Sequence, residues 1–544
     1  MGLATSMWAG VSGLQAHSEQ MGVIGNNLAN VNTVGYKSSR MDFEDLVYAN
    51  ISTAGGLGQV GEGVRVGAIQ SDFSQGGFQT TNNATDMAIS GMGFFNVKDR
   101  GTQTNYYTRA GNFNFDRNGY LVDAHNFAVQ GWQVNQGALK NATAQGQTLT
   151  QVPVQGSVTD VRLDTLALAA QNTSNMTVIS NLDPTKASQS TSTTNPFFSM
   201  FQNYNFNPAR PSDPALADTS FGFQNTLKVY DQRGGAHNAT IYYDKVSDVG
   251  GKEYWEYMVT CDPTEDGRQF TVNGNTVNMA SNSKAGVLMM GSMVFNDSGK
   301  LQNITSYTLN SSSYANSISN LSDWTLAKIS GSGYPVFTAN FRSVSGGSVS
   351  TASNAVSIAL NVGIRNSSTS WGTSATSADM IGFSHLSNAA ALQGYPAANI
   401  TINNLSTTNF QAASSTLYVS QDGFPPGTLQ SVSVDTDGVL SGRFSNGQVQ
   451  ALYVISLADF ASTWGLKRDG GNLFSQTRES GDALIGRANT GRLGSLSGSS
   501  LETSNVDMAS EMVQMIQTQR GFEANSKTIT TADTMLSEVI QLKR

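Results

Sequence analysis

The side chains best suited to chemistry in this sequence are four histidines and a single cysteine. His17, His125, His237 and His385 lie far apart, without the short spacings that are typical of zinc ligands. The sequence identifies no His or Asn partner for Cys261, so we interpret it as a buried structural thiol rather than a nucleophile. A lone cysteine cannot form an intrachain disulfide either, and stability must come from packing.

Three short motifs look like known sites, and each fails when its surroundings are considered. Gly56-Leu-Gly-Gln-Val-Gly61 has the spacing of a dinucleotide loop, but no apolar strand precedes it and no helical pattern follows. A calcium loop around Asp435–Gly438 would begin at Ser433 and end at Phe444, where a bidentate Glu is needed. Ser281-Asn-Ser-Lys284 is a lone S-x-x-K in a serine-rich chain. The sequence therefore predicts no catalytic residue, cofactor or metal, and we interpret the glycine-rich motif as a flexible connector.

The composition favours a turn-rich β protein. The chain has 544 residues, enough for about three or four domains, and its hydrophobic content of 39% is too high for a disordered chain of low charge. Charged residues make up only 13%, and Gly, Ser, Thr and Asn fill the difference. A net charge of −8 without a basic block argues against nucleic-acid binding. The sequence contains no apolar run long enough to predict a membrane-spanning helix. The absence of Lys or Arg before Lys37 argues against a cleaved signal peptide.

One short unit occurs four times and predicts tight hairpins. It consists of an apolar residue, Asp or Asn, two residues, Gly, one residue and a second apolar residue. The Asp or Asn side chain can accept hydrogen bonds from the turn backbone, and Gly can adopt the positive φ that closes the turn. The four copies are Phe115–Leu121, Tyr230–Ala236, Phe295–Leu301 and Val434–Leu440. With the alternating apolar residues of 156–424, they predict an antiparallel β sandwich or barrel.

The C-terminal stretch predicts a long helix with a narrow apolar stripe. We expect a helix over 505–542, capped by Ser504 or Asn505 and followed by the basic pair Lys543 and Arg544. A sustained seven-residue repeat indicates a helix that packs against another helix. The first series is Met508, Met515, Phe522, Ile529 and Leu536, and a second series four residues along is Met512, Gln519, Ser526, Asp533 and Ile540.

The N-terminal stretch carries a matching pair of series. One is Met7, Leu14, Met21 and Leu28, and the other is Leu3, Gly10, His17, Ile24 and Val31. Four glycines each weaken this helix by about 1 kcal/mol relative to Ala, so we expect both ends to be largely disordered in the monomer and to fold in an assembly. Two ordinary amphipathic helices on one globular core are the alternative. The predicted assembly-interface residues are Leu3, Met7, Leu14, Met21, Ile24, Leu28, Met508, Met512, Met515, Phe522, Ile529 and Leu536.

The stretch Asn26–Arg40 resembles the N-terminal signature of the bacterial flagellar axial proteins, the family of rod, hook and hook-associated subunits. The matching positions are Asn27, Leu28, Ala29, Asn30, Thr33, Gly35, Tyr36 and Lys37. Residues 86–132 resemble the β domain that hook and distal rod proteins share. Residues 435–474 are similar to the returning inner β domain of hook proteins, and 501–520 to the start of the family's C-terminal helix. Little of 305–420 can be matched.

The resemblance implies a mainly β fold with long terminal α-helices, in which nested, discontinuous β domains are built on a coiled-coil-like inner domain made by both termini. The domain ranges that we expect are 1–35 with 504–544 for the inner helices, 36–75 with 491–503 for a connector, 76–155 with 425–490 for an inner β domain, and 156–424 for an outer β region. The outer region is long enough for a core domain and an inserted extra domain.

The function that the resemblance implies is structural rather than enzymatic. We expect a hook subunit that polymerises with itself into a curved tube and transmits torque from the motor and rod to the filament. The implied partners are the distal rod, hook cap and hook–filament junction proteins and the flagellar export apparatus. The implied location is the extracellular hook, reached by export in an unfolded state without a cleaved signal peptide. A distal rod subunit, a junction protein and a secreted β-rich adhesin or enzyme remain alternatives.

Overall fold

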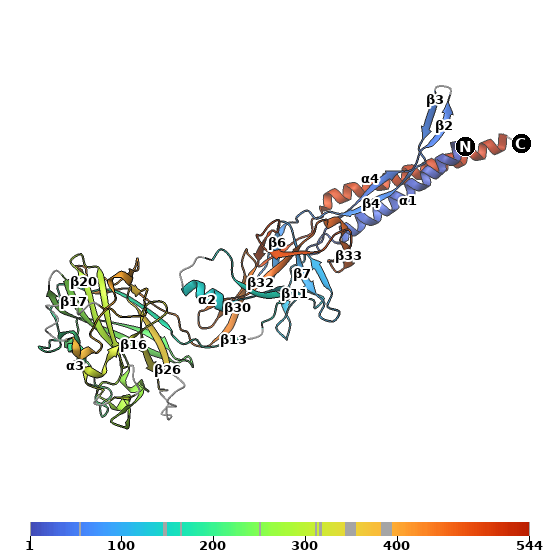
Figure 1. The fold of residues 1–544 in the computed structure, drawn as a ribbon. Helices are drawn as coiled ribbons and strands as arrows, with labels where there is room; N and C mark the ends of the chain where they lie inside the picture. The colour runs from blue at the N-terminus through green and yellow to red at the C-terminus, as the bar shows by residue number, and fades with distance from the viewer. Residues whose placement is uncertain are drawn as a thin grey trace. The chain divides into compact units, whose positions relative to one another are not determined.

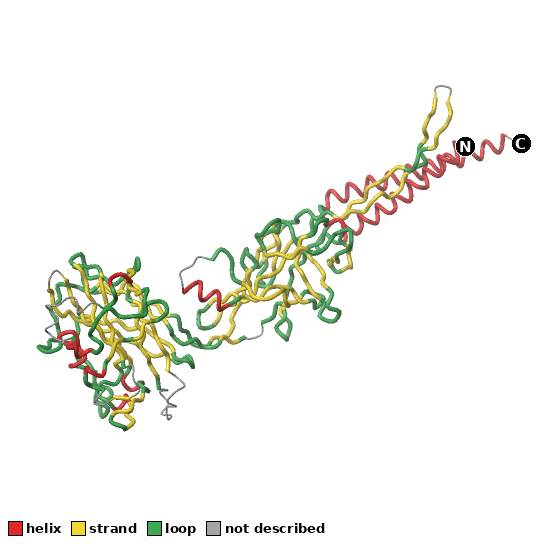
Figure 2. Tube along the Cα trace, in the orientation of Figure 1, coloured by secondary structure: helices red, strands yellow, loops and turns green. Residues whose placement is uncertain are grey.

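The computed structural model describes residues 2–53, 56–144, 149–163, 166–249, 252–309, 313–314, 318–342, 355–381 and 394–542. Strands dominate, and each end of the chain is a long helix (Figures 1 and 2). The chain forms two compact units: unit 1 is made of 1–166 and 428–544, and unit 2 of 167–427. Unit 2 is therefore inserted into unit 1 in sequence. The expected class, mainly β with terminal helices and nested discontinuous domains, is confirmed.

The elements of unit 1 come from both ends of the chain. From the N-terminal segment they are α1 (Gly2–Ala29), β1 (Ser39–Asp45), β2 (Ala49–Thr53), β3 (Gly56–Val60), β4 (Val64–Ser71), β5 (Phe78–Thr80), β6 (Met87–Ser90), β7 (Phe94–Lys98), β8 (Asn105–Thr108), β9 (Asn114–Phe115), β10 (Leu121–Val122), β11 (Ala128–Val134), α2 (Gln136–Ala144) and β12 (Val154–Asp160). From the C-terminal segment they are β30 (Gly427–Val434), β31 (Val439–Phe444), β32 (Val449–Asp459), β33 (Lys467–Gly470), β34 (Leu473–Ser475), β35 (Leu484–Arg487), β36 (Ser495–Gly498), β37 (Ser500–Glu502) and α4 (Met508–Leu542).

Unit 2 is built almost wholly from strands. Its elements are β13 (Ala167–Leu168), β14 (Asn175–Asn181), α3 (Ser199–Asn203), β15 (Phe223–Tyr230), β16 (Ala236–Val249), β17 (Lys252–Cys261), β18 (Gln269–Val272), β19 (Asn275–Asn278), β20 (Val287–Asn296), β21 (Leu301–Thr308), β22 (Ser313–Tyr314), β23 (Thr325–Leu326), β24 (Lys328–Ile329), β25 (Pro335–Asn340), β26 (Ala355–Asn361), β27 (Ile364–Asn366), β28 (Ile400–Ile402) and β29 (Ser415–Gln421).

The two terminal helices lie side by side in unit 1 (Figure 1). α4 begins at Met508, three residues later than we expected, because Asp507 and not Ser504 or Asn505 caps it. The Asp507 carboxylate accepts the backbone N–H of Ala509 at 3.1 Å and the hydroxyl of Ser510 at 2.7 Å, as an N-cap side chain does. The basic pair expected at the far end of this helix, Lys543 and Arg544, lies outside the described residues.

Residues 39–53 and 56–71 form a long antiparallel arm, and the interpretation of the glycine-rich motif as a flexible connector was wrong. β1 pairs with β4 along its whole length, and β2 pairs with β3 at the tip of the arm. The glycine-rich motif falls mostly within β3. From Val64 to Gln70 every second residue of β4 is half-buried and the residues between are exposed, the pattern of a strand with one covered face. The sequence does not reveal this strand pattern clearly, because glycines lie before and within β4.

The β domain of unit 1 needs both segments of the chain. Its main sheet runs β30-β31-β32-β11-β7-β8-β34-β33, so N-terminal strands β11, β7 and β8 lie between C-terminal ones. The central register pairs Gly131 with Ile455. Phe95, Phe113 and Leu457 are fully buried in the core beneath this sheet. Neither segment can complete the domain alone, since each would leave its own strands without their partners from the other segment.

Unit 2 contains two sheets that share one core. One sheet has the order β15-β16-β17-β20-β21-β23, and the other β24-β25-β26-β14-β29, with β14 and β26 parallel. Trp255 and Met293 from the first sheet and Phe337 and Ile358 from the second belong to the same buried cluster. The unit therefore has the sandwich-like packing that alternating apolar residues predict. An inserted extra domain remains a prediction.

All four predicted tight turns are confirmed. In each turn the Asp or Asn Oδ1 atom accepts two backbone N–H groups at 2.7–3.1 Å, and the glycine has a φ between 70° and 84°. The residue pairs are Asp116 with Gly119, Asp231 with Gly234, Asn296 with Gly299 and Asp435 with Gly438. The carboxylate of Asp435 is thus occupied by its own turn.

Candidate functional site

Two glycines of α1 let α4 approach closely. A Cβ atom added at Gly10 would lie 2.9 Å from the Ile529 side chain, and one added at Gly13 would lie 2.7 Å from the Asn525 amide. Both distances are shorter than van der Waals contact, so neither site has room for a larger residue. At Gly22 nothing lies within 4 Å of such a Cβ. Gly10 and Gly13, which would weaken α1 as an isolated helix, therefore allow α4 to pack closely against it.

The closest approach from the other side involves Gly521 of α4 and His17 of α1. A Cβ at Gly521 would lie 2.7 Å from the imidazole of His17, whose ring also contacts Phe43 edge-on at 5.5 Å between centroids. His17 is therefore a packing residue between α4 and the β arm, as its place on the seven-residue series suggests.

The seven-residue period is visible in the packing of α4. Met515, Ile529 and Leu536 of the first series are half-buried. A second line is also covered, and in it Glu511, Thr518 and Ala532 are buried and Asn525 is half-buried. This second line lies three residues along from Met508, whereas the series that we expected lies four along and is mostly exposed. Two side chains of the predicted interface, Met508 and Met512, are 46% and 49% exposed, and Phe522 is 39% exposed. Their contact with another subunit remains a prediction.

The predicted residues of α1 lie mainly on its covered side. Ile24 is 2% exposed. The half-buried members are Met7, Leu14, Met21 and Leu28. The side chain of Leu3 lies outside the described ones.

Asn27, from the family-like signature, ties three segments together. Its amide nitrogen donates to Glu511 Oε1 of α4 at 2.9 Å and to the Ser39 carbonyl at 2.8 Å. Its amide oxygen accepts the Ser39 N–H at 2.9 Å and the Tyr36 hydroxyl at 3.3 Å. Asn27 is 2% exposed and has all these partners, so a residue with a different donor and acceptor set would leave buried polar groups unpaired.

Lys37, a charged residue of the signature, belongs to a buried ionic cluster. Its Nζ atom lies 2.7 Å from Glu502 Oε1 and 2.6 Å from the Ser74 carbonyl, and Arg109 Nη1 lies 3.4 Å from Glu502 Oε2. Burial lowers the pKa of Lys37, and the Glu502 carboxylate opposes that shift. The pKa of Arg109 is lowered by burial in the same way. We call Lys37, Glu502 and Arg109 the junction cluster.

At Gly35 the backbone of the signature lies next to the junction cluster. Its φ is +67°, and a Cβ atom there would lie 2.5 Å from the Ala110 nitrogen. Its N–H donates to the Glu502 carbonyl at 2.8 Å. Only glycine satisfies both the positive φ and the close approach. Of the other signature residues, Asn30 donates its amide to the Asn26 carbonyl at 2.9 Å. Leu28 is half-buried and Ala29 is exposed.

Our sequence reading missed Glu502, Arg109 and Glu511 as partners of the signature. Glu502 and Glu511 lie more than 400 positions from Lys37, Arg109 lies directly after β8, and no local spacing connects them to the signature. The available signal was weaker: Glu502 and Arg109 both fall in stretches that resemble the family, and each is a charged residue within a largely uncharged stretch.

The groups that could have done chemistry have structural partners. Lys284 Nζ donates to the Phe201 carbonyl at 2.6 Å, and burial lowers its pKa to about 8. Cys261 is buried, which raises its pKa. The imidazole of His237 lies 2.8 Å from Glu265 and stacks on Phe341. His385 lies outside the described residues.

Within the described part of the chain, no group of His, Cys, Asp and Glu side chains could hold a metal ion. None of the helices in that part is both long and apolar enough to cross a membrane.

Four family models match successive parts of the chain. The flagella basal body rod protein model matches 7–37, and the D1 domain of flagellar hook protein FlgE/F/G matches 88–174. The D2 domain of flagellar basal body protein FlaE matches 201–424, and the C-terminal model of flagellar basal body rod FlgEFG proteins matches 497–542. The first match contains the signature up to Lys37, and the last contains Glu502 and Glu511.

Curated relatives match over nearly the whole length. The chain is 31% identical to flagellar hook protein FlgE of Treponema pallidum, over 99% of each chain. It is 29% identical to that of Borreliella burgdorferi over 99% of each chain, and 28% identical to that of Escherichia coli over 98% of each. A crystal structure of Helicobacter pylori flagellar hook protein FlgE2 covers 78% of this chain and 100% of its own, with a TM-score of 0.44 and 13% identity.

The two terminal helices are joined through a buried cluster to a discontinuous β domain, and the four family models match in order along the chain. These features define an axial protein of the bacterial flagellum. Within that class, the chain belongs to the flagellar hook protein family, since the match to a hook protein extends from end to end. The rod, junction and adhesin alternatives are not favoured.

Proposed function

We propose that this subunit of the flagellar hook polymerises through α1 and α4 into a tube whose inner wall is made of the paired helices. The observation that carries the proposal is the apolar surface that the helix pair leaves uncovered. Trp8 is 71% exposed, Ile516 53% and Val539 54%. Large apolar side chains in such numbers on one pair of helices indicate further protein contacts. Head-to-tail contacts between unlike surfaces produce open helical polymers when they do not close.

The role that we propose is mechanical rather than catalytic. The hook would act as a curved universal joint that carries torque from the motor and rod to the filament. Covering the apolar helix surface would hold subunits together. The Ser-, Thr- and Asn-rich β surfaces would form weaker polar contacts that exchange at low cost as the bent tube rotates, since exposed polar contacts contribute little net free energy.

We also propose that the subunit reaches the cell exterior unfolded, through the flagellar export apparatus, and that α1 stays on the mature subunit. The packing of Gly10 and Gly13 against α4 supports retention of α1, because its loss would uncover the facing side of α4. The neighbours in the assembly would be the distal rod protein at one end and the junction protein at the other, with the hook cap present during growth.

Electron microscopy of basal bodies from cells lacking the gene tests the proposed function. We expect complete rods without hooks. Truncated rods would indicate a rod subunit instead, and hooks without filaments would indicate a hook–filament junction protein. Normal flagella would contradict any axial role.

A further inference from the structure

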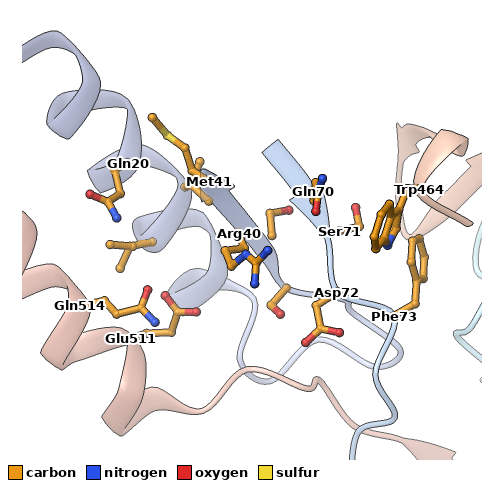
Figure 3. Close-up of a pocket in the computed structure, with 14 residues that line it drawn as sticks. Gln20, Arg40, Met41, Gln70, Ser71, Asp72, Phe73, Trp464, Glu511 and Gln514 are labelled. Atoms are coloured by element: carbon orange, nitrogen blue, oxygen red, sulfur yellow. The ribbon is translucent and has the colours of Figure 1, made fainter. Parts of the chain in front are cut away.

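A groove with a volume of about 500 Å³ lies in unit 1 where α1, β1, β4 and α4 meet the short turn η9 (Thr463–Gly465) (Figure 3). One end is polar and contains Glu511 and Gln514 of α4. The other end is aromatic and contains Phe73 and Trp464. We call this cavity the Trp464 groove.

Both ends of the groove contain a group without a suitable partner. Glu511 is 9% exposed, and its Oε2 atom is buried without a hydrogen-bond partner among the described residues, whereas Oε1 accepts from Asn27. Burial raises the pKa of this carboxyl. A buried, unpaired carboxylate oxygen is costly and favours an incoming donor. Trp464 is 70% exposed, and exposed tryptophans are typical anchors of protein interfaces.

An arginine of the same chain borders the groove without pairing with Glu511. Arg40 lies among the lining residues, and its Nε atom contacts Asp42 at 3.1 Å. Its side chain is 73% exposed. The donor for Glu511 must therefore come from elsewhere, or Arg40 must leave Asp42.

The face of α4 opposite Glu511 carries exposed apolar and basic side chains, which complement the aromatic and acidic ends of the groove. A rotation of about 100° per residue places Val513, Ile516, Arg520 and Lys527 within about 40° of the point directly opposite Glu511. Val513 is 54% exposed and Ile516 53%, and both basic side chains are exposed. Among the described residues, no carboxylate lies within ion-pair distance of Arg520. We call these four residues the outward stripe.

We propose that the Trp464 groove of one subunit receives the outward stripe of α4 from a second copy of this chain. The Arg520 guanidinium of the incoming copy pairs with Glu511, and its Val513 and Ile516 pack on Trp464. A guanidinium suits this place because its planar set of donors matches a carboxylate better than an ammonium does. The proposal rests on self-assembly of the subunit, as proposed above.

The geometry of these two surfaces agrees with growth of an open polymer. The groove and the outward stripe lie on different sides of one helix, so a subunit can use its groove for one neighbour and its stripe for another. Such a heterologous contact repeats from copy to copy without self-limiting closure. A two-fold dimer would instead require the same surface on both partners.

Thiol cross-linking between two singly substituted chains tests the contact. Copies with Gln70→Cys, which places a thiol in the groove, are copolymerised with copies carrying Ala524→Cys beside the stripe, and a short bifunctional thiol reagent is added. The native Cys261 is buried and stays unreactive. The matched control is Gln519→Cys, about 7.5 Å from Ala524 along α4 and about 140° away from it around the helix, at about 60° to 120° from the stripe residues. We expect covalent dimers from the first pair at about ten times the yield of the control pair, a ratio that reflects preferential apposition.

Charge reversal in the full-length subunit is the second measurement. We expect Arg520→Glu to raise the critical concentration for polymerisation about tenfold. Arg117→Glu alters an exposed arginine of the β domain by the same charge and should leave that concentration unchanged. Polymers that form normally with Arg520→Glu and give equal cross-linking in both pairs would overturn the groove proposal while leaving self-assembly intact. Failure of the native chain to polymerise would overturn self-assembly itself.

Discussion

Lys37 and Glu502 form an ion pair of 2.7 Å between residues 465 positions apart, and neither side chain is exposed to solvent. The pair joins the signature after α1 to the strand before α4, and Arg109, the residue after β8, adds a contact from the β domain. The junction cluster thus attaches the helix pair to the β domain of unit 1. This position explains why a lysine, which is rarely buried, occurs inside the signature.

Replacing Lys37 with Met should destabilise unit 1 by about 3–5 kcal/mol, because it leaves the Glu502 carboxylate buried without its closest cation. The free energy of unfolding from urea titration of the purified subunit measures this loss. Arg65→Ala is the control, since Arg65 pairs with Glu44 at 3.1 Å on the surface and should cost less than about 1 kcal/mol. Equal losses in both variants would show that the cluster does not stabilise the unit.

Two glycine substitutions in α1 should have opposite effects. Gly13→Ala places a Cβ 2.7 Å from Asn525, so it should separate the helices and lower the fraction of subunit that sediments as polymer. Gly22→Ala meets no atom within 4 Å in the subunit and should raise helix stability by about 1 kcal/mol. Sedimentation and circular dichroism measure the two effects. Similar behaviour of the two variants would contradict the packing role of Gly13.

Acidic substitutions on the apolar stripe of α4 should abolish polymerisation without unfolding the β domains. Met515→Asp and Phe522→Asp both place a charge where an apolar contact is expected, at a cost of several kcal/mol if the charge becomes buried. Thr530→Asp, at an exposed site on the side of the same helix, is the control. Electron microscopy scores the tubes, and near-ultraviolet circular dichroism reports on the folded β domains. Tubes of normal length from Phe522→Asp would remove that residue from the interface.

The buried carboxyl of Glu256 should make the stability of unit 2 depend on pH. Burial raises its pKa well above 4.5, although the N–H of Met200 donates to it. The folded state therefore binds the proton more tightly than the unfolded state, and stability falls as pH rises from 4.5 through the folded pKa. Glu256→Gln removes this titration, so its advantage over the native chain should grow with increasing pH.

Denaturation of both proteins at several pH values, followed by the fluorescence of the buried Trp255 and Trp324, measures that difference. Glu479→Gln, at an exposed position, should show no such trend. A constant difference between Glu256→Gln and the native chain across the pH range would mean that this carboxyl does not titrate between the two states.

The predicted disorder of the two ends in the free monomer needs a separate measurement. Backbone NMR of the soluble subunit should show few dispersed helical signals from residues 3–30, because α1 contains glycines and depends on α4 for packing. Sharp, dispersed helical signals there would mean that the helix pair forms before assembly.

Local chemistry made part of this fold predictable. The four turns were found because an Asp or Asn, a Gly and two apolar residues at fixed spacing specify a turn by themselves. The terminal helices were found from their seven-residue period, which needs no knowledge of the partner. The start of α4 was placed three residues too early, because Asn505 is as good a capping residue as Asp507 in sequence but uses its side chain to bind Ser38 and Ser74 instead.

Contacts between distant segments limited the prediction of the site. The resemblance identified Asn27, Gly35 and Lys37, but nothing in the spacing of residues pointed to Glu502 or Glu511 as their partners. The packing line of α4 that contains Thr518 and Asn525 was missed for a related reason: most of its residues are polar, and Asn525 faces Gly13 of α1 instead of an apolar side chain. A search for apolar stripes cannot find a contact made by small and polar groups.

The two-segment construction of unit 1 has a consequence for the order of folding. Strands β32 and β34 are synthesised late, yet they complete a sheet that begins with β7, β8 and β11, and the last element, α4, completes the helix pair with α1. A chain that is cut short during translation therefore cannot finish this unit, because its C-terminal segment is missing. The late closure would act as a check on completeness, because a truncated product would lack the strands that flank β11, β7 and β8 and the helix that packs against α1.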